Sequence, residues 1–195
     1  MNPSHTSLER LLLREAVKEH MSDHMHHRLP EEACGVLIGH ADEASRSITV
    51  TQFIPVKNTA DFPLHSFHLD PVQWTRLVLA EKGIVGLFHS HPHTTPDPSG
   101  EDLLQLQSFG GLLRVYAIAS PAVPGASGLN GLQLHAYKII RSEEERESFS
   151  QLPPSSKSLP GRAFYSLAPV PFAILRNDEL ADTSNLQSQC YPSLR

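Results

Sequence analysis

The chain has 195 residues, of which 39% are hydrophobic, and carries a formal net charge of −5 at neutral pH. This length suits one domain of ordinary size plus an extension, with enough apolar side chains for a sizeable core. The sequence shows no Lys/Arg stripe, so we expect neither nucleic acid nor an anionic membrane as a partner. Its apolar runs are also too short to span a bilayer.

Three helices and a larger number of strands are predicted along the chain. Residues 6–9, Thr-Ser-Leu-Glu, are typical of a capping box, and apolar residues then recur at helical spacing, which predicts a first helix to about Arg28. Asp70-Pro71 is typical of a helix N-cap followed by proline, and a third helix is predicted from about Ser99 to Gly110. The predicted strands cover residues 32–40, 47–56, 67–69, 83–91, 113–120 and 132–140. Strands with helices set among them predict an α/β (α+β) protein with a sheet core.

The composition changes after residue 140. We therefore predict a domain over residues 1–140 and a C-terminal extension over 141–195, which is partly linker-like. Residues 163–175 are apolar but interrupted by prolines, so we expect this segment to dock on the domain or on a partner.

The compartment is predicted from the N-terminal stretch and the cysteines. Leucines near the N-terminus alternate with Glu and Arg, so we expect no secretory signal there. Cys34 and Cys190 lie far apart in sequence and suit a reducing compartment better than a disulfide scaffold. We expect a cytoplasmic protein.

Two histidines at the end of a predicted strand are candidate metal ligands. His89 and His91 are two residues apart, so both point to the same side of the strand, and Pro92 ends it. Zinc in a hydrolytic site takes three protein ligands and a water. Asp102, in the first turn of the next helix, is the candidate third ligand, and the helix dipole favours its ionised form. The alternative is a polar loop, in which Ser99 and Asp102 form an ordinary capping box.

A zinc-bound water also needs a general base near the metal. Glu31 and Glu32 lead directly into the apolar stretch that follows, and Glu32 shares a strand face with Cys34. Spacing alone leaves open whether both glutamates are instead solvated turn residues.

The segment EEACGVLIG, followed later by HSHP and then by Ser99 and Asp102, resembles the JAMM (MPN-plus) zinc metallopeptidases, especially their small bacterial and archaeal members. The resemblance covers roughly residues 7–140. It implies a mixed β-sheet core flanked by helices, with a cytidine-deaminase-like architecture. It also implies one Zn²⁺ per chain with a water as fourth ligand. By position, His89, His91 and Asp102 would be the zinc ligands. Glu32 would be the general base, and Ser99 would hold the substrate carbonyl or oxyanion.

The function implied by the resemblance is hydrolysis of a peptide or isopeptide bond after the C-terminal Gly-Gly of a ubiquitin-like protein, including the sulfur-carrier type. The ubiquitin-like protein would be the partner of this chain. A homodimer is a possible assembly of the chain itself. One alternative is a non-catalytic MPN-type scaffold. Another is a zinc peptidase acting on a different peptide, such as a phage-tail or cell-wall peptide.

Other residues are weaker candidates. His20, His24 and His27 share one face of the first predicted helix and could bind a metal, although a solvated helix end is the simpler interpretation. Cys34 is interpreted as a packed small residue rather than a nucleophile. We interpret Trp74 as helix-to-sheet packing, and His93 as incidental to the metal site.

Overall fold

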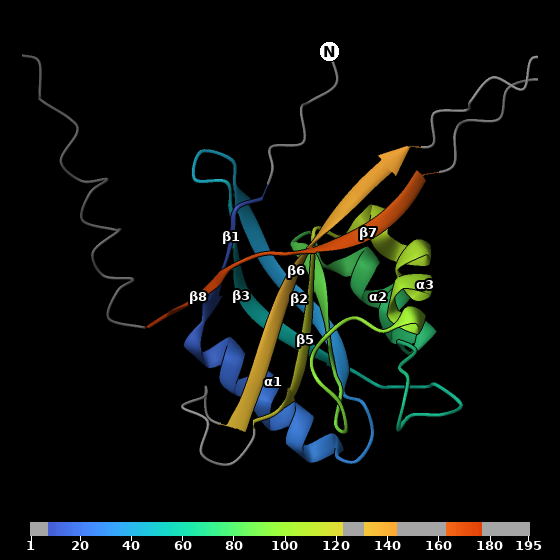
Figure 1. The fold of residues 1–195 in the computed structure, drawn as a ribbon. Coiled ribbons are helices and arrows are strands. Elements are labelled where there is room, and N and C mark those ends of the chain that lie inside the picture. The colour runs from blue at the N-terminus through green and yellow to red at the C-terminus, as the bar shows by residue number, and fades with distance from the viewer. Residues whose placement is uncertain (1–7, 123–130, 144–162, 177–195) are drawn as a thin grey trace, which may run out of the picture.

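A mixed β-sheet of eight strands forms the centre of the computed structural model, which describes residues 8–122, 131–143 and 163–176 (Figure 1). The strands are β1 (Arg10–Arg14), β2 (Cys34–Asp42), β3 (Ser47–Val56), β4 (Ile84–Ser90), β5 (Val115–Pro121), β6 (Leu132–Glu143), β7 (Ala163–Pro169) and β8 (Phe172–Leu175). The helices are α1 (Glu15–Arg28), α2 (Pro71–Ala80), α3 (Gly100–Phe109) and the short 3-10 turn η1 (Gly110–Leu112). The predicted α+β class, with a sheet flanked by helices, is confirmed. None of the helices described is long and apolar enough to cross a membrane.

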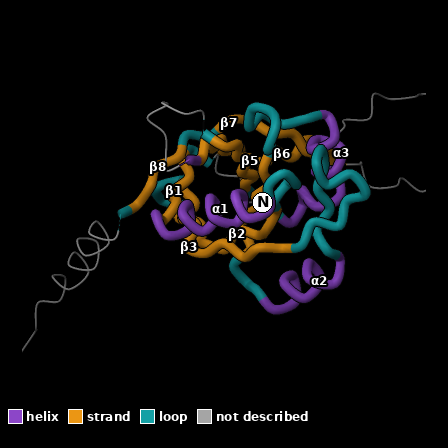
Figure 2. The backbone as a smooth tube through the Cα atoms, turned by 90° about the horizontal axis from the view of Figure 1, so that it is seen from below, coloured by secondary structure: helices purple, strands orange, loops and turns teal. Residues whose placement is uncertain are grey.

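The strand order is β7-β6-β5-β4-β2-β3-β1-β8, so β4 lies near the middle of the sheet. The sheet curves around α1, while α2 and α3 lie outside the curve (Figure 2). Apolar side chains of α1 pack with one face of the sheet in the larger core cluster. The other face packs against α2 and α3, with Trp74 and Leu106 among the contacts, so the packing role predicted for Trp74 is confirmed.

The N-terminal part of the first predicted helix is a strand. β1 pairs in parallel with both β3 and β8, and α1 begins only at Glu15. Within β1, Leu11 and Leu13 are buried while Arg10 is exposed, which is the alternation of a strand. The prediction was wrong here because leucines at helical spacing also fit this alternation, and pairing with distant strands decided between the two.

Two further predictions can be compared with the structure. Asp70 caps α2, because its side chain accepts a hydrogen bond from the Gln73 amide. The strand predicted at residues 67–69 is reduced to an isolated bridge between Asn58 and Leu69. Residues 6 and 7 of the predicted capping box, and Cys190, lie outside the described residues.

The segment 163–175 forms the two edges of the sheet. β7 pairs with β6 and β8 pairs with β1, so one short stretch of chain crosses from one edge to the other. Val170, between the two strands, is buried and its amide donates to the Ala136 carbonyl. The predicted boundary at residue 140 falls inside β6, and residues 163–175 complete the same sheet.

Candidate metal centre

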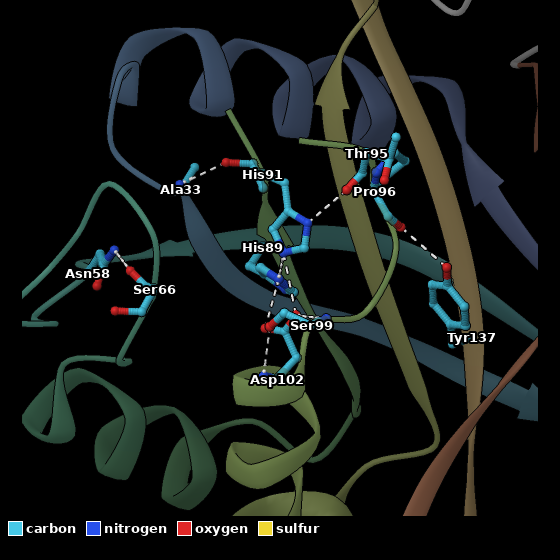
Figure 3. Close-up of polar contacts among 11 residues, drawn as sticks. Ala33, Asn58, Ser66, His89, His91, Thr95, Pro96, Ser99, Asp102 and Tyr137 are labelled. Carbon is cyan, nitrogen blue, oxygen red and sulfur yellow. Dashed lines mark hydrogen bonds and ion pairs between the residues drawn. The ribbon is translucent and has the colours of Figure 1, made fainter. Parts of the chain in front are cut away.

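The end of β4 places two imidazoles together. His89 is fully buried and His91 is 6% exposed, and their Nε2 atoms lie 2.9 Å apart (Figure 3). Ser90, between them, points away and accepts a hydrogen bond from the Ala33 amide through its hydroxyl. The alternation of the strand therefore directs both imidazoles to the same point, as the spacing predicts.

The first turn of α3 brings a carboxylate to the same point. Asp102 Oδ1 lies 3.1 Å from His89 Nε2, and Oδ2 lies 3.4 Å from His91 Nε2. Asp102 is also part of a capping box, since the Ser99 amide donates to its carboxylate and its own amide donates to the Ser99 hydroxyl oxygen. These two reciprocal hydrogen bonds orient the carboxylate toward the histidines (Figure 3).

The three side chains have the spacing of zinc ligands. The two Nε2 atoms lie 2.9 Å apart, and they lie 3.1 and 3.4 Å from the two different oxygens of the Asp102 carboxylate. Tetrahedral zinc with bonds of about 2.0–2.1 Å separates neighbouring ligand atoms by about 3.3 Å. Two imidazoles and one carboxylate are also the donor set of a catalytic zinc site with one open position. The residues present therefore fit a zinc ion.

Glu32 lies beside the two histidines at the mouth of β2. Glu32, His89 and His91 each offer one ligand atom, and these three atoms all lie within 4.8 Å of one another. Glu32 is 5% exposed, so it is not a solvated turn residue. Its amide donates to the Pro63 carbonyl and its carbonyl accepts from the Asn58 side chain, which fixes the backbone at this position.

Two carboxylates thus compete as the partner of the histidines. Asp102 forms an ion pair with each imidazole, whereas no hydrogen bond or ion pair joins Glu32 to them, although its carboxylate lies within 4.8 Å of their ligand atoms. We therefore favour Asp102 as the third ligand and Glu32 as a neighbour of the metal position.

The environments of the two carboxylates shift their pKa values in opposite directions. Burial would raise the pKa of Asp102, but hydrogen bonds from His89 and His91 outweigh it and hold this pKa well below its usual range. For Glu32, burial dominates and raises the pKa to about 7, partly offset by the nearby His91. Burial also lowers the pKa of His89, which favours the neutral, metal-binding form of its imidazole.

Contacts around the histidines orient their rings. His91 Nδ1 lies 2.9 Å from the Thr95 carbonyl and donates to it, which leaves Nε2 as the ring atom directed at the metal position. The Phe67 ring stacks on His89, with centroids 4.5 Å apart and an angle of 22° between the planes. Neither contact was predicted from the sequence, because Thr95 acts through its backbone and Phe67 comes from a separate loop.

The other candidates lie away from this centre. His20 and His24 contact the Phe53 ring, and His27 donates to a carbonyl of its own helix, so these histidines do not gather within the described chain into a group that could hold a metal. Cys34 is buried, and burial raises the pKa of its thiol to about 12, which suits a packed residue. His93 is exposed in the loop beyond the site.

Comparison with known proteins identifies the family. Residues 14–147 match the family model described as prokaryotic homologs of the JAB domain. The chain belongs to this family. The predicted resemblance to the JAMM and MPN-type proteins is thereby confirmed.

This prokaryotic JAB protein is similar to one named protein and to one protein of known structure. It is 38% identical over 96 residues to a protein of Haloferax volcanii named desampylase, a match that covers 47% of the chain and 64% of that relative. The match thus spans less than two thirds of the relative's length. A Desulfitobacterium hafniense protein of known solution structure is 22% identical, with a TM-score of 0.58, over 86% of this chain and 94% of that one. This second likeness shows a shared fold.

Proposed function

We propose that the chain is a zinc-dependent peptidase or isopeptidase that hydrolyses the bond after the C-terminal Gly-Gly of a ubiquitin-like protein. The observation that carries this proposal is the convergence of His89, His91 and Asp102 on one point, with the buried Glu32 beside it. Membership in the prokaryotic JAB family and the likeness to a desampylase support the substrate class. The cytoplasmic location and the homodimer stay predictions.

The roles follow from the positions of the side chains. His89, His91 and Asp102 would hold zinc, which when bound lowers the pKa of a water and polarises the scissile carbonyl. The Glu32 carboxylate accepts the proton of the attacking water and returns it to the leaving amine. Burial raises the proton affinity of Glu32 in the metal-free protein, and this suits a base that works near neutral pH.

Ser99 combines two roles. It caps α3 through its side chain, because its hydroxyl oxygen accepts a hydrogen bond from the Asp102 amide. A hydroxyl that accepts one hydrogen bond still carries its own proton. Because Ser99 is exposed, this proton can be donated to the oxyanion that forms on the substrate carbonyl.

The first test measures zinc content and chelator-sensitive cleavage of ubiquitin-like proteins extended beyond Gly-Gly. We expect one zinc per chain and cleavage that stops on chelation. Glu32→Gln should bind zinc and be nearly inactive, because the water loses its proton acceptor. Stoichiometric zinc with no cleavage of any such tail would redirect the proposal to another peptide substrate. A chain that binds no zinc would overturn it.

The second test separates the two roles of Ser99. Ser99→Ala should lose about 10²–10³ in kcat through the missing oxyanion donor, while losing about 1 kcal/mol of stability through the missing cap. Asp70→Ala is the matched control, because Asp70 caps α2 in the same way and lies outside the site. Equal losses of kcat in both variants would mean that Ser99 acts only as a cap.

A further inference from the structure

The loop of residues 92–98 joins the end of β4 to the start of α3. It therefore connects the two elements that carry the candidate zinc ligands, and it ends at Ser99. Three of its residues, Pro92, Pro96 and Pro98, have no backbone N–H, so the loop has few donors with which to order itself.

Side chains of the sheet bind four consecutive residues of this loop. The contacts are Ser120 Oγ to the Thr94 carbonyl at 2.8 Å, His91 Nδ1 to the Thr95 carbonyl at 2.9 Å, Tyr137 hydroxyl to the Pro96 carbonyl at 3.2 Å, and His135 Nδ1 to Asp97 Oδ1 at 3.1 Å. The donors come from β5, from β6 and from His91, which directly follows the neighbouring strand β4. The loop is thus held from the sheet beneath it.

β6 supplies the two contacts nearest to α3. His135 pairs with Ile118 of β5, which pairs with His89 of β4, so all three share one face of the sheet. Tyr137, two residues along β6, lies on that face as well. Its side chain points at the loop in Figure 3. Neither residue belongs to the motif that contains the candidate ligands.

We propose that Tyr137 and His135 are positioning residues, which hold the loop at Pro96 and Asp97 and thereby place Ser99 and Asp102 against the two histidines. The capping box carries this effect forward, because it links Ser99 and Asp102 by hydrogen bonds in both directions. A shift of the loop end therefore moves the oxyanion donor and the third ligand together. The part of this inference that concerns Ser99 rests on the proposed function.

Tyr137 contributes more than His135. Tyr137 is 6% exposed, and burial, together with Asp97, raises its pKa to about 12, so the hydroxyl remains a proton donor. If the Tyr137 hydroxyl is removed, the Pro96 carbonyl loses this buried hydrogen-bond donor. The pair between His135 and Asp97 is more exposed, with side chains 39% and 61% accessible, and so is weakened by solvent.

The main test compares Tyr137→Phe with Tyr165→Phe. The first removes the hydroxyl that binds the loop, whereas the second removes a hydroxyl on β7 that lies near Gly111, at the far end of α3. Both proteins are loaded with Co²⁺, whose visible absorption spectrum reports the geometry of the ligands without any substrate. We expect Tyr137→Phe to change this spectrum and to weaken metal binding about tenfold. The control should keep the spectrum and affinity of the wild type.

Kinetics on the zinc-loaded proteins supply the second readout. We expect Tyr137→Phe to lower kcat about tenfold at unchanged KM, because the displaced groups act on the transition state rather than on substrate binding. If no candidate substrate is cleaved by the wild type, the proposed function fails, while the Co²⁺ spectra still test the positioning role.

Asp97→Asn provides a variant that cannot fail through core packing, because Asp97 is exposed. It should weaken metal binding about two- to threefold, whereas Glu43→Gln, which weakens the exposed pair with Arg114, should have no effect. A Tyr137→Phe protein with wild-type spectrum and metal affinity overturns the inference. If Tyr137→Phe does not fold, the inference is overturned when Asp97→Asn binds the metal as tightly as the Glu43→Gln control.

Discussion

Two buried carboxylates at this site differ because of what surrounds each of them. Asp102 accepts hydrogen bonds from two imidazoles and an amide, which stabilises its charge despite burial. For Glu32, burial is the strongest influence, and the pKa rises to about 7. Residues of the same chemical type are thereby suited to different tasks, one as an anionic ligand and the other as a proton acceptor.

Glu32 should make the stability of the metal-free protein dependent on pH. Its folded pKa of about 7 exceeds the ordinary value of 4.5, so its proton stabilises the folded state at low pH and this contribution is lost as the pH rises through 7. At pH 8 metal-free Glu32→Gln should therefore be about 3 kcal/mol more stable than the wild type, with the difference vanishing below about pH 4.5. Urea unfolding across this range measures it.

The matched control for this measurement is Glu31→Gln. Glu31 is the neighbouring glutamate, more exposed and paired with Arg28. Its substitution should not reproduce the gain at high pH. Parallel stability curves for the wild type and Glu32→Gln would contradict the buried, weakly acidic state described for Glu32.

At the scale of elements, the C-terminal strands protect the sheet. β7 covers the free edge of β6 and β8 covers the free edge of β1, and unpaired edges are sites of aggregation. The stretch between them also contributes the buried Val170 to the core. These strands lie beyond residue 147, where the family match ends, yet they contribute to the same sheet.

Removal of these strands should destabilise the whole domain. A chain ending at Glu143 exposes both edges, so we expect a lower melting temperature and aggregation, measured by thermal unfolding and size-exclusion chromatography. A chain ending at Arg176 keeps all eight strands and should elute and melt like the full chain. Equal behaviour of the shorter chain would show that β7 and β8 are dispensable for the fold.

At the scale of the whole molecule, the candidate metal centre links the sheet to a helix on its outer face. His89 lies in β4, His91 directly follows this strand, and Asp102 lies in α3, so a bound ion connects two layers of the fold. A ligand that binds only the folded state stabilises it according to its concentration and affinity.

Zinc should therefore raise the melting temperature. At a concentration about 100-fold above the dissociation constant, the gain of about 2.7 kcal/mol corresponds to about 5–10 °C for a chain of this size. Thermal unfolding with zinc and with a chelator measures the difference. Asp102→Asn should remove most of it, whereas Glu19→Gln, an exposed substitution on α1, should keep it. An equal shift in both variants would place the zinc elsewhere.

Local patterns predicted the parts of the structure that depend on neighbouring residues. The two-residue spacing of His89 and His91 directs both imidazoles to one side, and the capping pattern at Ser99 places Asp102 in the first turn of α3. Asp70 caps α2 for the same reason. Each of these features is set within a few residues of chain, so the sequence alone is enough to predict it.

Long-range pairing decided the rest. Residues 10–14 became a strand because β3 and β8 offer partners on both sides, although the same leucines also fit a helix. His135 had no partner that the sequence could identify, and only the neighbouring positions of β4, β5 and β6 bring it to Asp97. By itself, the sequence determined the local features, namely the shared side of His89 and His91 and the place of Asp102 in the first turn of α3. The tertiary structure decided what surrounds and holds the candidate metal centre, because burial and contacts between distant segments exist only once the sheet has formed.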